Sequence, residues 1–99
     1  MYALMRYTVK ADQLESHLEL LRDVYDDLAI RQPDGIAWTT YQIAETRSFV
    51  ELVEGPDLPH PLPQLESFQR YRIGLDDRCE GDRDFHELHQ IGAFPRRHD

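Results

Sequence analysis

The chain lacks several features that would assign it quickly to a class of protein. Cys79 is the only cysteine among 99 residues, so no disulfide can form within the chain, and a reducing cytoplasm is the expected location. No apolar run approaches the roughly 18 residues that cross a bilayer, and residues 1–10 fit a strand better than a charged and then apolar leader. We therefore expect no membrane association.

Basic residues are also scarce. The chain has 11 Lys and Arg against 19 Asp and Glu, a formal net charge of -8, which repels phosphate backbones and anionic lipids. Residues 47–52 vaguely resemble the central strand of RNA-recognition modules, but the glycine and the paired aromatics are missing. Nucleotide-binding loops and Ser-His-Asp hydrolase patterns are absent from the sequence. Nucleic acid is therefore excluded as a partner.

The first half of the chain predicts a strand, a helix and a hairpin. Residues 2–10 have the two-residue strand period with apolar residues on both faces. Asp12 and Glu15 form a capping pair for a helix that Pro33 and Gly35 end. Residues 36–44 and 49–54 read as two antiparallel strands joined by a short loop at 45–47. The expected buried stripe of the helix comprises Leu14, Leu18, Leu21, Tyr25 and Leu28.

The second half predicts a helix and a last strand. Residues 55–63 contain prolines at 56, 59, 61 and 63, which predicts a stiff, extended connection that could wall a pocket mouth. A second helix should run from Pro63 to Gly81. Residues 83–94 should close a single domain of residues 1–94, followed by a solvated tail at 95–99. The residues at helical spacing along the second helix are Leu65, Phe68, Arg72, Leu75 and Cys79.

This order, strand-helix-strand-strand-helix-strand, defines an α+β domain with a four-stranded antiparallel sheet. Two helices can cover only one face of such a sheet, yet the strands are apolar on both faces. A domain this small gains appreciably by covering a bare sheet face. We therefore expect a homodimer in which the two sheets face each other.

Residues 49–54 and 61–69, together with the helix start after residues 9–12, resemble the antibiotic-biosynthesis monooxygenase-like family of dimeric α+β barrels. The resemblance spans almost the whole chain and implies a ferredoxin-like fold that pairs into an eight-stranded barrel. Some members of that family oxidise reduced polycyclic aromatics with dioxygen and no cofactor, and others degrade haem. The chain has Val53 where a Trp is often found, and no histidine lies between Pro63 and Glu80, where haem-degrading relatives carry their iron ligand. Both departures argue against haem.

Four aromatic residues, Trp38, Tyr41, Phe68 and Tyr71, could form a wall against which a planar ligand stacks, or they could be ordinary core. Arg72 could orient a phenolate or carboxylate, or lay its stem on the sheet and reach water.

Histidines supply the remaining candidates. His60 could move a proton at a cleft mouth, or be a surface loop residue. His86 and His89 would point to opposite faces of a strand, so we predict no metal site.

The favoured function is a cofactor-independent monooxygenase that acts on a small aromatic or polyketide-like substrate. Arg72 would favour the substrate anion, and His60 or Tyr71 would transfer a proton. No flavin or iron is expected, because the substrate would supply the electrons. The alternative is a non-catalytic small-molecule-binding or interaction domain of the same fold.

Overall fold

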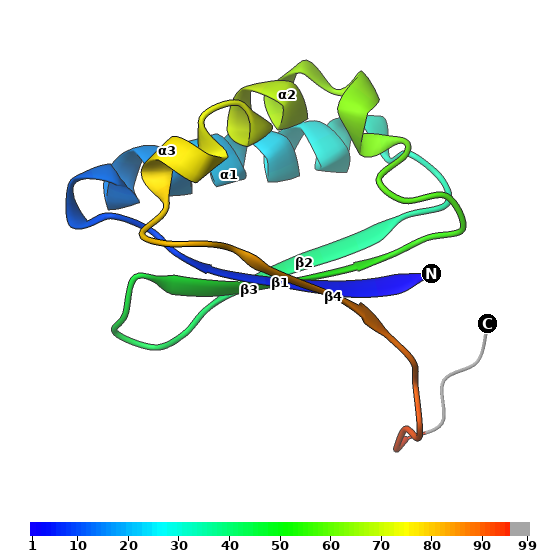
Figure 1. Cartoon of the computed structure of the whole chain (residues 1–99). Helices are drawn as coiled ribbons and strands as arrows, with labels where there is room; N and C mark the ends of the chain where they lie inside the picture. The colour runs from blue at the N-terminus through cyan, green and yellow to red at the C-terminus, as the bar shows by residue number, and fades with distance from the viewer. Residues whose placement is uncertain (96–99) are drawn as a thin grey trace.

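The computed structural model describes residues 1–95 as one antiparallel sheet with its helices packed against a single face (Figure 1). The strands lie in the order β2-β3-β1-β4. This is the predicted α+β ferredoxin-like arrangement, and the fold class is confirmed. Most of the predicted tail, residues 96–99, lies outside the described residues. The elements are β1 (Tyr2–Thr8), η1 (Ala11–Gln13), α1 (Leu14–Arg31), β2 (Ala37–Gln42), β3 (Ser48–Glu54), η2 (Leu62–Gln64), α2 (Glu66–Arg72), α3 (Leu75–Arg78) and β4 (Asp84–Leu88).

The strand register brings one row of side chains toward the helices. Tyr7 lies opposite Phe49, and Met5 lies opposite Glu51. Trp38 of β2 lies opposite Val53 in the same row. Because alternate residues of a strand point to opposite faces, the helix-facing row of β3 holds a carboxylate between two apolar side chains.

Helix α1 presents the predicted apolar stripe with two additions. His17 and Val24 are fully buried beside Leu21, whereas the other predicted stripe residues are half-buried. The prediction that Asp12 and Glu15 cap the helix is wrong. The 3-10 helix η1 precedes α1, and no side chain caps the N-terminus of η1 or of α1. Val9 forms a β-bridge with Cys79, so the chain leaves the sheet directly before this turn.

The second helix is broken, which corrects the predicted continuous element. Ile73 is extended and Gly74 takes a left-handed conformation with φ of 78°, so α2 and α3 are out of phase. Within α2, Tyr71 is buried, and Arg72, which occupies a predicted stripe position, is exposed. On α3, Arg78 is buried with only 6% of its surface exposed.

The proline-rich connection is compact, and the prediction of an extended segment is wrong. The His60 amide donates to the Asp57 carbonyl, and the Leu62 amide donates to the Pro59 carbonyl. Consecutive turns satisfy these backbone groups locally and lead into η2. The last strand, β4, is shorter than the predicted strand of residues 83–94. Within residues 1–95, no helix has the length and apolar character needed to span a membrane.

Candidate functional site

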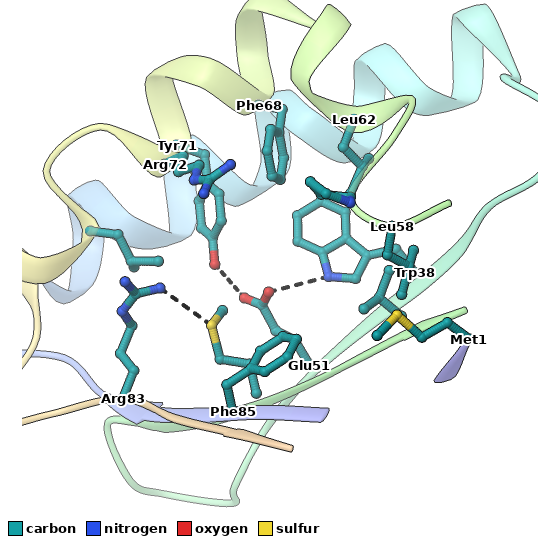
Figure 2. Close-up of a pocket in the computed structure, with 14 residues that line it drawn as sticks. Met1, Trp38, Glu51, Leu58, Leu62, Phe68, Tyr71, Arg72, Arg83 and Phe85 are labelled. Carbon is teal, nitrogen blue, oxygen red and sulfur yellow. Dashed lines mark hydrogen bonds between the residues drawn. The ribbon is translucent and has the colours of Figure 1, made fainter. Parts of the chain in front are cut away.

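A pocket of about 310 Å³ lies between the helix-facing side of the sheet and α2 (Figure 2). Because most of its lining is apolar, the pocket suits a small hydrophobic molecule, and its volume is near the lower end of the usual range for ligand sites. The aromatic lining residues are Trp38, Phe68, Tyr71 and Phe85, and the aliphatic ones include Leu58, Leu62 and Leu75.

Glu51 is the one carboxylate among the residues that line this pocket, and it is 3% exposed. Its Oε2 accepts hydrogen bonds from the Tyr7 hydroxyl, at 2.5 Å, and from the Tyr71 hydroxyl. Its Oε1 accepts from the Trp38 indole Nε1, at 3.2 Å. Figure 2 shows the carboxylate between Tyr71 and Trp38. Three elements, β1, β2 and α2, thus supply donors to one acid.

Burial and hydrogen bonding shift the pKa of Glu51 in opposite directions. Burial raises the pKa of the Glu51 carboxyl, and the three hydrogen bonds offset part of that increase in pKa. Burial and the Glu51 charge also raise the pKa of the Tyr7 and Tyr71 hydroxyls, which therefore keep their protons and remain donors. A buried carboxylate with a raised pKa is a stronger base than a solvated one, and such groups cluster at functional sites.

His17 and Arg78 extend the hydrogen-bond network from Tyr7 on the side away from Glu51. The His17 Nε2 atom is 2.8 Å from the Tyr7 hydroxyl oxygen, and the Arg78 Nε–H donates to His17 Nδ1 at 3.2 Å. Burial, together with the positive charge of Arg78, lowers the pKa of His17 to about 4. His17 is therefore neutral at physiological pH.

The pocket mouth has two cationic side chains. Arg83 lines it and forms an ion pair with Asp76, at 2.8 Å, while also contacting the Met5 sulfur. Arg72 lines it from the exposed side of α2. Phe85 is 62% exposed although it lines the pocket, so this edge is open to solvent.

The structure brings together four of the six residues that the sequence singled out. Trp38, Phe68, Tyr71 and Arg72 all line the pocket. Tyr41 does not, because it lies three positions after Trp38 on β2 and so occupies the opposite sheet face, where it is 56% exposed.

His60 is the other residue left outside the pocket. It is exposed in the turn before η2, and its Nε2 lies 3.4 Å from Gln64 Nε2. The structure thus places His60 on the surface of the proline-rich connection, next to the pocket residue Pro59.

Sequence reasoning missed Glu51, Tyr7, His17 and Arg78. One signal was available: Glu51 is a charged residue at a strand position whose neighbours two away, Phe49 and Val53, are apolar. Such a carboxylate must find donors when the strand is buried.

His86 and His89, the histidine pair for which no metal site is predicted, lie on and just after β4. His86 lies opposite Leu4 on the face away from the helices, and His89 follows the end of the strand. Within the described part of the chain, no group of three or more His, Cys, Asp or Glu side chains could hold a metal ion.

Fold and site together define a ferredoxin-like α+β domain with an aromatic pocket around one buried carboxylate. Comparison with solved structures shows the same fold in antibiotic biosynthesis monooxygenases. One such enzyme superposes with a TM-score of 0.71 at 17% identity, over 92% of this chain and 98% of its own. A Mycobacterium tuberculosis protein gives a TM-score of 0.73 at 14% identity, over 94% of this chain and 96% of its own. SnoaB, a cofactor-independent oxygenase from Streptomyces nogalater, gives 0.63 at 15% identity over 96% of each chain.

No family model matches the sequence, and a search of curated proteins found no significant match. The structural likeness, at these low identities, establishes the fold, and the chemistry has to be argued from the site.

Proposed function

We propose that this protein is a cofactor-independent oxygenase that acts on a small, electron-rich aromatic compound. The observation that carries the proposal is Glu51, a buried carboxylate with a raised pKa in the wall of an apolar, aromatic pocket. Similarity of fold to a cofactor-independent oxygenase supports the same reaction class.

The reaction begins with a proton transfer from the substrate to Glu51. The substrate class is a reduced aromatic ketone of the anthrone type, whose CH₂ group is acidic because its anion is delocalised over the rings. The anion transfers one electron to dioxygen, and the resulting radical and superoxide combine to form a C–O bond. Cleavage of the O–O bond then turns the CH₂ group into C=O and releases one water, so one O₂ is consumed for each quinone formed.

Each lining group has a defined task in this scheme. Trp38 and Phe68 pack against the rings, since both aromatic side chains line the pocket. Arg72 stabilises the delocalised anion from the mouth. Once protonated, Glu51 returns that proton to the reduced oxygen, and the Tyr71 hydroxyl remains a hydrogen-bond donor to the carboxyl group. His60 and Tyr41 have no task in it, because both lie outside the pocket.

The test is dioxygen consumption with an anthrone substrate in buffer free of metal and flavin. We expect the wild type to accelerate uptake, and Glu51→Gln to reduce the rate by about 10²- to 10⁴-fold, the usual contribution of a general base. Arg72→Gln should reduce it less, and His60→Gln is the matched control with an unchanged rate. Equal rates in all four samples, at the level of buffer alone, would refute an oxygenase.

A ligand-binding domain without catalysis is the second candidate. It is favoured by the hydrogen bonds of Glu51, because three donors already satisfy a carboxylate that does no chemistry. Thermal shift distinguishes the two: a ligand at a hundred times its dissociation constant adds about 2.7 kcal/mol of stability. Stabilisation by an anthrone without oxygen uptake would select the binding domain.

We also propose that the sheet face opposite the helices binds a second copy of this chain. Helices cover only one face of the sheet (Figure 1). The other face carries Leu4, Val50, Leu52 and Leu88, all half-buried, and the exposed Tyr41. Pairing two such faces removes this apolar surface from water. Light scattering should report about twice 11.7 kDa at micromolar concentration, and a clean monomer would refute the pairing.

A further inference from the structure

Four buried side chains form a continuous line of hydrogen bonds from α3 to the pocket. Arg78 Nε lies 3.2 Å from His17 Nδ1, and His17 Nε2 lies 2.8 Å from the Tyr7 hydroxyl. The Tyr7 hydroxyl lies 2.5 Å from Glu51 Oε2. The line therefore connects a permanent cation to the pocket carboxylate through two neutral groups.

The direction of each hydrogen bond follows from the chemistry of its end residue. A guanidinium has only donors, so His17 Nδ1 must accept from Arg78. A neutral imidazole carries one proton, which is then on Nε2 and is donated to the Tyr7 oxygen. The Tyr7 proton is left to bond Glu51. Arg78 thus fixes the orientation of every proton in the line.

The packing holds His17 in this orientation. Its ring is fully buried, with its centroid 4.9 Å from that of Phe49 and 5.6 Å from that of Tyr71. Arg78 is held by the backbone carbonyls of Tyr71, at 2.6 Å, and Ile73, at 3.2 Å. Neither His17 nor Arg78 lines the pocket itself.

We propose that His17 and Arg78 are positioning residues that hold Glu51 as a hydrogen-bond acceptor, and that Oε1 is the atom that takes the substrate proton. Oε2 already accepts from two hydroxyls, whereas Oε1 accepts only from the Trp38 indole. Because Arg78 has no acceptor, a proton taken up by Glu51 cannot leave along the line toward α3. It returns to the pocket, where the reduced oxygen needs it. The base role rests on the proposed function, but the direction of the line does not.

The surroundings of Glu51 define which other groups can influence its titration. Tyr7 and Tyr71 face it with their hydroxyls, Trp38 faces it with its indole N–H, and the charge of Arg83 acts on it from the pocket mouth. Variants of His17 leave these four groups in place, so a change in Glu51 titration reports on the line behind Tyr7.

Nuclear magnetic resonance tests the line without turnover. Long-range ¹H–¹⁵N correlation should show His17 with its proton on Nε2 at pH 7, and carboxyl ¹³C shifts should follow the titration of Glu51. In Tyr7→Phe, Glu51 should bind a proton about 10-fold more tightly, as expected for the loss of one hydrogen bond to a charged group. His17→Phe should shift the titration in the same direction, and His17→Gln, whose amide can donate to Tyr7, should restore it.

A proton on Nδ1 of His17, or a Glu51 titration that is unchanged in Tyr7→Phe, would overturn the proposal. Should His17→Phe fail to fold, the tautomer of the wild type and the Tyr7→Phe titration still decide it. His60→Gln is the control, because His60 is exposed, lies outside the pocket and has its hydrogen-bond contact with Gln64. If the resonances behave as expected in a protein that consumes no dioxygen, the positioning line stands and the oxygenase proposal fails alone.

Discussion

The buried imidazole of His17 makes a definite prediction about stability in acid. In the folded protein, burial and the Arg78 charge hold the pKa of His17 at about 4, compared with 6.5 when the ring is solvated. Between these two values the unfolded chain binds a proton that the folded chain does not. Stability from this group is therefore complete above pH 6.5 and is lost as the pH falls toward 4.

The size of the effect follows from the two pKa values. The difference between 6.5 and about 4 corresponds to at most about 3 kcal/mol of unfolding free energy. We expect about 2 kcal/mol, since solvent screening reduces such interactions. The perturbation that isolates this contribution is His17→Gln, because glutamine does not titrate and other groups act equally in both proteins.

Urea unfolding followed by circular dichroism at pH 7, 6, 5 and 4 provides the measurement. The wild type should lose about 2 kcal/mol more than His17→Gln between pH 7 and pH 4, which is a difference of about 1 M in the urea midpoint. His60→Gln should follow the wild type at every pH, since that ring is exposed. Parallel curves for the wild type and His17→Gln would show that His17 titrates normally and that the buried line is wrong.

Three further predictions concern other parts of the molecule. Burial raises the folded-state pKa of Glu51, so the stability that this group contributes is lost as the pH rises. In urea titrations from pH 4 to pH 8, the unfolding free energy of Glu51→Gln should therefore rise relative to that of the wild type, by at most about 1.4 kcal/mol per pH unit. A difference that stays constant with pH would contradict a raised pKa. Gly55→Ala places a Cβ 2.6 Å from the Gly35 carbonyl oxygen and should lower the unfolding free energy by about 1–3 kcal/mol in thermal or urea unfolding. Gly92→Ala is the control, because its Cβ meets nothing within 4 Å and should change stability little. Equal losses of stability in the two variants would contradict the close approach at Gly55. Tyr41→Asp places a charge in the proposed dimer interface and should halve the mass seen by light scattering. Because Tyr41 is 56% exposed, the change in monomer stability should be less than about 0.5 kcal/mol. An unchanged mass would show that Tyr41 is not in the interface.

The fold could be predicted because its signals are local and repetitive. The two-residue period of residues 2–10 and the stripe beginning at Leu14 each belong to one element, and their order leaves few topologies. The second helix was predicted wrongly in its details because Gly74 was not recognised as a left-handed break inside an apolar periodic pattern. The continuous pattern thus misses that α2 ends at Arg72, with Phe68 and Tyr71 as its buried aromatic residues.

The pocket could be predicted only in part, because strand pairing decides which side chains meet. Trp38, Phe68, Tyr71 and Arg72 were singled out by residue type, and the fold brings them to one pocket. The carboxylate that joins them could not be placed, because its partner Tyr7 lies 44 residues away in sequence. Hydrogen bonds across such distances have no local pattern to reveal them.

The donors to Glu51 come from 13, 20 and 44 residues away along the chain, and each comes from a different element. The Glu51 carboxyl group has its full set of donors only when β1, β2 and α2 have all packed against β3. Contacts between residues far apart in sequence, such as Tyr7 and Glu51, must first overcome the entropy of loop closure. The pocket chemistry should therefore report native structure as an all-or-none signal, and a transient undocking of α2 would switch the site off while the sheet remained intact.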